Sequence, residues 1–234
     1  TEPEDIDNKL MKFEKTVKFA ILALAALLSA GAFIVPKKRI EEKQERYIPF
    51  AERYRQKHYK ISPYDSLIRS WSDSASLDWR FVSAIVYHES HFRHDAVSRR
   101  GATGLMQMMP STAAHYGADS LLDASQSVMA GTRYIKDLYK SYGKVAADET
   151  ERKKLTLAAY NAGGGRVEDL INYTRYRGKD PSYWDNIVSV IPEMRADSIL
   201  TLDTVKLGKF NGKETIEFVE AVMARYHKFK RIAP

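Results

Sequence analysis

The sequence predicts a mainly α-helical domain preceded by one apolar segment near the N-terminus. After residue 60, apolar residues recur every three or four positions, which is the spacing of one face of an α-helix. The alternating pattern of a β-strand never continues for long, so we expect at most a minor hairpin. Glycines and prolines interrupt the helical patterns at intervals, as they do at helix ends.

The 234 residues have the composition of a globular protein, with 44% hydrophobic and 29% charged side chains. A net charge of +7 favours an anionic partner, although a solvated basic surface explains this modest excess equally well. No recognised nucleic-acid module accompanies the basic charge, so we expect no nucleic-acid partner. The chain contains no cysteine, which excludes disulfides, thiolate zinc sites and a cysteine nucleophile.

Four regions are expected along the chain. Residues 1–18 form a polar tail. Residues 19–35 (FAILALAALLSAGAFIV) carry no charge, and their length is at the short end of the range that spans a bilayer, about 17–25 residues. Residues 36–60 are dense in charge and form a stalk, and residues 61–234 form the helical domain. The apolar segment fits a retained anchor helix, a cleaved signal peptide or a buried helix of a soluble core, and we favour the anchor.

The first half of the domain shows the start and stop signals of four helices. An amphipathic stripe follows Pro63, and a second helix is expected at 78–90. Two glycines three residues apart place a loop at 98–104. Pro110 begins a third helix, since proline is tolerated in the first turn, and Gly143 ends a fourth.

The second half of the domain is interrupted by charge-rich and glycine-rich stretches. Residues 144–154 predict a charged surface loop that leads into a helix at 155–160, and the glycine triplet 163–165 breaks this helix. Segments 173–183 and 192–212 lack a helical pattern, and we expect them to form loops that line a cleft. Further helices are expected from residue 167, at 181–191 and at 214–229.

Glu89 occupies a position where a helix ordinarily carries an apolar side chain. It shares one helical face with Val82, Ile85 and Val86, because the four residues follow the i, i+3, i+4, i+7 spacing. Burial on such a face disfavours the charged carboxylate and raises its pKa, which suits a general acid near neutral pH. A glutamate that turns out to water, or that pairs with Arg93, is the alternative.

Three short motifs follow one another in the domain: residues 88–92 (HESHF), 101–110 (GATGLMQMMP) and 159–163 (AYNAG). Together they resemble the catalytic domain of the soluble-lytic-transglycosylase type, glycoside hydrolases related to goose-type lysozyme. Residues 180–192 (DPSYWDNIVSVIP) are similar to the segment after the third motif in membrane-bound lytic transglycosylase F. The resemblance covers about residues 62–229 and implies a lysozyme-like all-α catalytic domain.

The resemblance implies an enzyme that cleaves the β-1,4 bond between N-acetylmuramic acid and N-acetylglucosamine in peptidoglycan and leaves a 1,6-anhydromuramic acid end. It implies Glu89 as the general acid and then the base, with the sugar's own 6-hydroxyl in place of water. Glycosidases that hydrolyse use two carboxylates instead. A hydrolysing muramidase and a catalytically weak peptidoglycan-binding scaffold are the alternatives. No cofactor is expected, and the histidines do not follow a metal-binding motif.

The motifs also imply the residues that contact the substrate. Side-chain amides offer a donor and an acceptor, which suits N-acetyl groups and sugar hydroxyls. Ser90 either orients the Glu89 carboxylate or bonds to nearby backbone. Met106 is expected near the cleft, although core packing is its commoner role. The expected substrate-binding residues are Ser90, Ser98, Met106, Gln107, Tyr160 and Asn161.

One position departs from the family pattern. The family has a tyrosine in its final helix, a few residues after a glutamate, and the matching stretch 214–219 (ETIEFV) carries Phe218. Phenylalanine cannot donate a hydrogen bond, so either another tyrosine supplies the hydroxyl or activity is reduced. Tyr173, Tyr176 and Tyr226 are the candidates.

The apolar segment and the resemblance together indicate a bacterial cell envelope location. We expect an anchor in the inner membrane through residues 19–35, with the catalytic domain in the periplasm, or export if the leader is cleaved. The expected partners are peptidoglycan glycan strands and the membrane. The sequence does not indicate a protein partner.

Overall fold

The computed structural model describes residues 60–234. The expected tail, the apolar segment 19–35 and the stalk up to residue 59 lie outside the described residues, so the anchor helix stays a prediction. Within residues 60–234, no helix is both long enough and apolar enough to cross a membrane.

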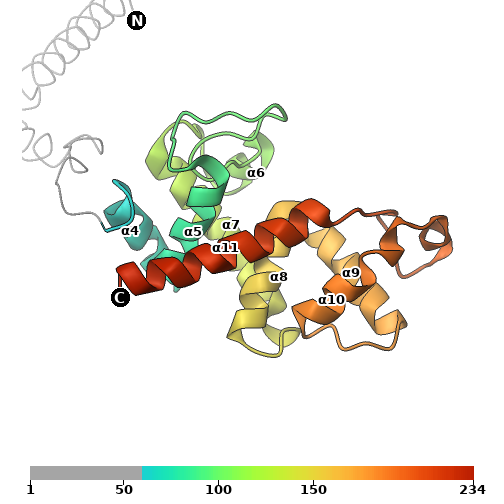
Figure 1. Ribbon diagram of the computed structural model, residues 1–234. Coiled ribbons are helices and arrows are strands. Elements are labelled where there is room, and N and C mark those ends of the chain that lie inside the picture. Colours follow the sequence, from blue (N-terminus) through green and yellow to red (C-terminus); the bar gives the residue numbers. More distant parts are fainter. Residues whose placement is uncertain (1–59) are drawn as a thin grey trace, which may run out of the picture. The chain divides into compact units, whose positions relative to one another are not determined.

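Helices form the regular structure of the described region (Figure 1). The α-helices are α4 (Asp65–Ala75), α5 (Trp79–Ser90), α6 (Pro110–His115), α7 (Ala124–Ser141), α8 (Glu149–Ala162), α9 (Gly164–Tyr176), α10 (Trp184–Val190) and α11 (Lys213–Ile232). The short 3-10 helices are η1 (Tyr142–Lys144), η2 (Glu193–Arg195) and η3 (Asp197–Thr201). Between residues 60 and 234 no strand forms, and the loop after α5 holds two isolated β-bridges. The mainly α fold class is confirmed for this region.

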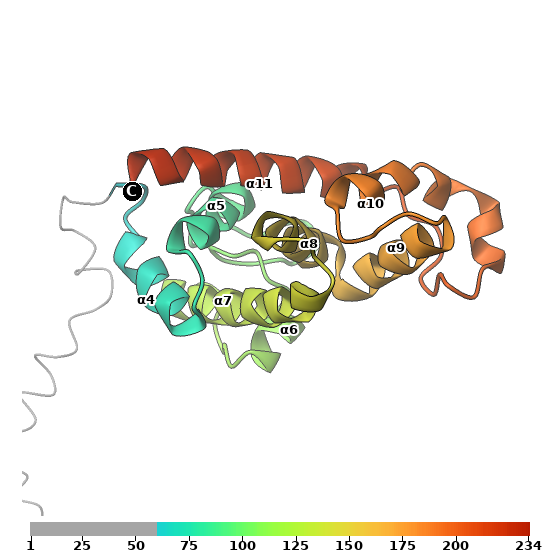
Figure 2. The ribbon, with the colours of Figure 1, turned by 90° about the horizontal axis from the view of Figure 1, so that it is seen from below.

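Two helices, α5 and α8, form the centre of the domain. Residues 81–86 of α5 and 155–159 of α8 are buried without interruption, so neighbouring elements enclose both helices on every side. α11 packs along both of them, α4 packs on α5 and α7, and α7 packs on α8. In Figure 2, α11 lies along one side of α5 and α8, and α4 and α7 lie on the opposite side.

The prediction of a loop at residues 144–154 is wrong from residue 149 onward, because α8 begins at Glu149. The Asp148 side chain caps the helix by accepting two backbone N–H groups of its first turn. The charges that suggested a solvated loop are partly buried instead. Glu151, for example, is buried and accepts the backbone N–H of Trp184. A run of charges in the sequence does not reveal which members find partners in the fold.

The loop predicted at 173–183 is helical at its start, since α9 continues to Tyr176. Gly163, with φ +89°, separates α8 from α9, as the glycine triplet predicts. Segment 192–212 contains η2 and η3 besides loops. Asp169 of α9 holds this segment, because its two carboxylate oxygens accept two consecutive backbone N–H groups from it at 2.8 Å.

A hydrogen-bonded cluster centred on Asp78 fastens α11 to the beginning of α5. The Asp78 carboxylate accepts the backbone N–H and the guanidinium of Arg80, and it accepts the Tyr226 hydroxyl at 2.9 Å. Arg80 also donates to the carbonyl of Ala233, which follows α11, at 3.1 Å. Burial alone would raise the pKa of Asp78, but the hydrogen bonds from Arg80 and Tyr226 hold it below its ordinary value.

We expect Tyr226→Phe to lower the free energy of unfolding by about 1–2 kcal/mol, because it removes a hydrogen bond to a charged group. Urea unfolding followed by circular dichroism measures the change. Tyr176→Phe is the matched control, since that side chain is 60% exposed, and it should cost less than about 0.5 kcal/mol. An equal loss in the two variants would contradict the role of the Asp78 cluster.

Candidate active site

Glu89 lies in the last turn of α5, at the edge of a cavity. Val82, Ile85 and Val86, on the same helical face, are fully buried, as their spacing predicts. The cavity has a volume of about 520 Å³, within the usual range of small-ligand sites, roughly 300–1,000 Å³. Its lining also includes Ser98, Arg99, Arg100 and Gln107 from the loop after α5, Tyr134 from α7, Tyr160 and Asn161 from α8, and Glu214 from α11.

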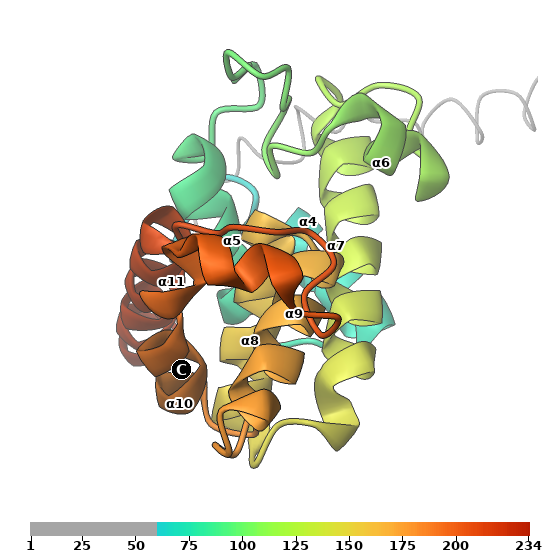
Figure 3. The same cartoon turned by 90° about the vertical axis from the view of Figure 1, so that its right-hand side faces the viewer.

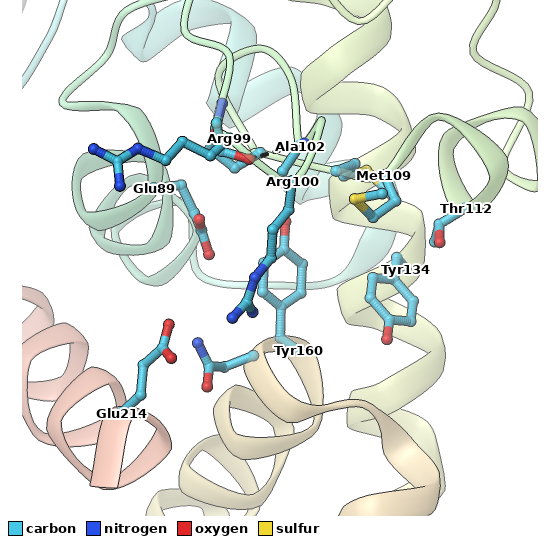
Figure 4. Close-up of a pocket in the computed structure, with 13 residues that line it drawn as sticks. Glu89, Arg99, Arg100, Ala102, Met109, Thr112, Tyr134, Tyr160 and Glu214 are labelled. Carbon is cyan, nitrogen blue, oxygen red and sulfur yellow. Dashed lines mark hydrogen bonds between the residues drawn. The ribbon is translucent and has the colours of Figure 1, made fainter. Parts of the chain in front are cut away.

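The surroundings of the Glu89 carboxyl group favour its protonated form at neutral pH. Burial raises its pKa to about 8, and the negative charge of Glu214 adds to the shift. In Figure 4 the two carboxyl groups point toward one another from α5 and α11. The ion pair with Arg93 does not form, because Arg93 contacts Asp95 instead. The surroundings of Glu89 therefore favour a protonated carboxyl group near neutral pH, and its role as the acid stays a prediction.

Glu214 is not among the site residues that the sequence predicts. An acidic residue in the first turn of a helix is common, because it complements the helix dipole, so Glu214 carries no distinguishing signal in the sequence. Tyr134, Arg99 and Arg100 were missed for a similar reason, since a tyrosine in an amphipathic helix and arginines in a loop are ordinary. The packing of α11 and α7 around α5 and α8 brings Glu214 and Tyr134 to the cavity, whereas Arg99 and Arg100 reach it from the loop after α5.

The loop between α5 and α6 presents Gln107 and Ser98 to the cavity. Figure 3 shows this loop and α6 standing above the ends of α5 and α7. The Gln107 amide nitrogen donates to the carbonyls of Ala96 and Gly104 at 2.9 and 3.0 Å, and its backbone has φ +46°. The Ser98 hydroxyl accepts the N–H of Ala102 at 3.0 Å. Both side chains therefore hold the loop together and leave their remaining acceptor or donor capacity for a ligand.

Tyr160 and Asn161 reach the cavity from the C-terminal end of α8. The Tyr160 hydroxyl donates to the carbonyl of Met106 at 2.6 Å, and burial, followed by the charge of Glu89, raises its pKa well above the ordinary value. The Asn161 side-chain oxygen accepts the hydroxyl of Thr215 at 2.8 Å, which leaves its N–H groups as donors. Four of the six expected substrate-binding residues thus meet at the cavity with Glu89.

The other two, Ser90 and Met106, do not line the cavity. Ser90 is buried, and its hydroxyl donates to the carbonyls of Val86 and Leu105 at 3.2 and 2.9 Å. Ser90 therefore ties the end of α5 to the loop through the backbone, which is the second of the two roles considered for it. Met106 is fully buried, packed where a side chain on Gly131 of α7 would collide with it.

Residues 66–182 match the family model described as the Transglycosylase SLT domain, which is half of the chain. The chain belongs to this family. Two curated relatives carry the name Membrane-bound lytic murein transglycosylase F. The one from Marinobacter nauticus is 31% identical over 74% of this chain and 34% of its own length. The one from Shewanella frigidimarina is 35% identical over 65% of this chain and 32% of its own length. The chain spans about a third of the length of these relatives.

Solved structures of the same family share the fold of this SLT domain. The 70 kDa soluble lytic transglycosylase of Escherichia coli matches with a TM-score of 0.50 and 25% identity, over 72% of this chain and 24% of that one. An inactive mutant of the lytic transglycosylase Slt of Pseudomonas aeruginosa matches with a TM-score of 0.52 and 22% identity, over 88% of this chain and 29% of that one. These likenesses confirm the all-α SLT fold of the described region.

Phe218, where the SLT family pattern has a tyrosine, is half-buried on α11 and does not line the cavity. The three tyrosines considered as substitutes lie elsewhere. The Tyr173 hydroxyl donates to Glu193, the Tyr226 hydroxyl donates to Asp78, and Tyr176 stacks on Tyr173. The phenolic side chains at the cavity are Tyr134 and Tyr160. We expected segments 173–183 and 192–212 to line a cleft, but neither segment lines the cavity at Glu89.

The raised pKa of Glu89 predicts that Glu89→Gln stabilises the SLT domain at alkaline pH. Between about pH 4.5 and 8 the unfolded chain has lost this proton and the folded chain keeps it, so stability falls as the pH rises. Each unit of pKa shift corresponds to about 1.4 kcal/mol. Chemical unfolding at pH 8.5 should show Glu89→Gln more stable than the wild type, and the difference should vanish at pH 4. A constant difference at both pH values would contradict the raised pKa.

Two glycines of the loop after α5 test how tightly the loop is packed. Gly101 and Gly104 both have left-handed backbones, with φ +86° and +80°. A Cβ on Gly104 would lie 2.0 Å from the carbonyl oxygen of Leu121, whereas one on Gly101 meets nothing within 4 Å. Gly101→Ala should therefore cost about 1 kcal/mol in unfolding free energy, and Gly104→Ala about 2 kcal/mol more. Equal losses in a urea titration would refute this packing.

Proposed function

We propose that this SLT domain is a peptidoglycan lytic transglycosylase that cleaves the β-1,4 bond between N-acetylmuramic acid and N-acetylglucosamine. The observation that carries the proposal is the largely buried carboxyl group of Glu89, whose surroundings raise its pKa to about 8 and which lines a cavity of small-ligand size. Family membership and the names of the relatives support the same activity.

In the proposed reaction, Glu89 gives its proton to the glycosidic oxygen while the bond from that oxygen to C1 of the muramic acid breaks. The Glu89 carboxylate then accepts the proton of the 6-hydroxyl of the muramic acid. At the same time, the 6-oxygen forms a bond to C1 of the same sugar. The proton is recovered and no water is consumed, so the product ends in a 1,6-anhydro ring. A hydroxyl held in the same molecule has a large advantage over external water. A pKa near 8 suits both steps, because the acid is protonated and its conjugate base is basic enough to take a proton back.

The polar groups left available at the cavity suit the N-acetyl and hydroxyl groups of the substrate. We assign Ser98, Gln107 and Asn161 to hydrogen bonds with the sugars, and Tyr160 to contact with a sugar ring. Ser90 and Met106 take supporting roles in this proposal, since they lie behind the cavity and fix the loop and α8 around it.

Glu214 makes hydrolysis the second candidate. A second carboxylate that faces the acid is the arrangement glycosidases use to activate water. The products separate the two reactions, because an anhydro end is lighter by one water than a reducing end. The names of the relatives favour the transglycosylase reaction.

We also propose that the domain acts in the bacterial cell envelope, on the periplasmic side of the inner membrane. The apolar segment 19–35 and the membrane-bound designation of the relatives support this location. Peptidoglycan strands would then be the partner in reach of the domain.

We expect Glu89→Gln to reduce the release of muropeptides from purified sacculi by at least about a hundredfold, because the proton donor is lost. For the wild type, kcat/KM should fall about tenfold per pH unit above pH 8, as Glu89 loses its proton. Mass spectrometry should show anhydro ends. Glu220→Gln is the matched control, because Glu220 is exposed on α11, outside the cavity lining. Undiminished release by Glu89→Gln would overturn the assignment of the acid.

A further inference from the structure

A tight turn carries two adjacent arginines over the cavity. The carbonyl of Ser98 accepts the N–H of Gly101 at 3.0 Å, so Arg99 and Arg100 are the two central residues of a β-turn. Three hydrogen bonds, including the one from Ala102 to the Ser98 hydroxyl, close the turn. The backbone therefore fixes where both side chains start, and both arginines line the cavity.

The two guanidinium groups have no acidic partner within residues 60–234. Neither Arg99 nor Arg100 forms an ion pair there, and both side chains are exposed. Most other arginines of the domain are engaged. Arg80, Arg93, Arg166 and Arg177 pair with carboxylates, and Arg69, Arg133, Arg152 and Arg225 lie over aromatic rings. The pair at the cavity is therefore available to a ligand.

The charge of the cavity favours an anion at this position. With Glu89 protonated, Glu214 is the negative group in the lining, against the two arginines. In Figure 4 the Arg100 side chain points into the space between Glu89, Glu214 and Tyr160, and the Arg99 side chain extends past Glu89 on the other side. The two arginines and Glu89 thus line the same cavity.

We infer that Arg99 and Arg100 form a carboxylate-binding subsite that holds acidic groups of the peptide stem beside the bond on which Glu89 acts. This inference rests on the proposed function. The N-acetyl sugars of a stem-bearing strand are uncharged, and its carboxylates belong to the peptide attached through the lactyl group of the muramic acid. The planar guanidinium fork matches a carboxylate with two parallel hydrogen bonds, which suits it to such groups.

The test compares native strands with strands whose stem carboxylates are converted to methylamides, which keeps the sugars and the peptide length. The wild type should prefer native strands in kcat/KM by about three- to tenfold, as expected for solvent-accessible ion pairs. This preference should weaken at high salt and fall toward one in R99Q/R100Q. Lys136→Gln removes one charge from an exposed position on α7 and should leave the preference unchanged. Equal rates of the wild type on both strands would overturn the inference.

Strands stripped of stems by an amidase carry a lactyl carboxylate alone and identify the source of the anion. If the wild type cleaves the stripped strands slowly, and R99Q/R100Q does not change this rate, the result supports binding of the stem carboxylates. If the wild type cleaves them as fast as native strands, and R99Q/R100Q lowers this rate, the subsite binds the lactyl carboxylate and the stem assignment is overturned. If the wild type cleaves no strand, the proposed function fails, and binding decides the inference. Sedimentation of the Glu89→Gln variant with native and methylamide sacculi should then show a preference that R99Q/R100Q abolishes. Equal binding would overturn it.

Discussion

Removal of one carboxyl group from water is the constraint on which this site depends. Glu89 holds its proton because α5 is enclosed, with α4 and α11 packed along it, and because Glu214 faces it across the cavity. Contacts far from the cavity take part in this packing, among them the Asp78 cluster that fixes α11 to the start of α5. A change that loosened α11 and hydrated Glu89 would lower the pKa of its carboxyl group, so the helix packing supports the raised pKa.

In the loop after α5, side chains that line the cavity also hold the loop together. Gln107 and Ser98 use part of their hydrogen-bonding capacity to close the loop, and Ser90 ties it to α5. This arrangement holds polar groups in fixed positions before a ligand arrives, which reduces the ordering required on binding. The left-handed backbones of Gly104 and Gln107 are part of the same design, since they let the chain fold back within a few residues.

The charges at the cavity divide into two groups with different consequences. Glu214 acts on Glu89 by raising its pKa, which strengthens its affinity for the proton. Arg99 and Arg100 sit at the tip of a turn, where solvent screens them and a ligand can reach them. One cavity therefore combines a carboxyl group whose pKa is raised with two exposed guanidinium groups, because the carboxyl group is largely withdrawn from water and the arginines lie at the tip of a turn.

Much of this protein was determined by the sequence alone. The helical periodicity predicts the fold class, and the apolar neighbours of Glu89 predict a raised pKa. The three motifs predict the family, and the family resemblance predicts four residues that line the cavity with Glu89. These signals are local, so a single chain reveals them. Other features were decided by the tertiary structure. The charged stretch before residue 155 is helical from Glu149, and Glu151 within it is buried against Trp184. Ser90 and Met106 are buried behind the cavity, and Glu214, 125 residues from Glu89, is close enough to raise its pKa. Burial and long-range proximity depend on how helices pack against one another, and local spacing does not encode that packing.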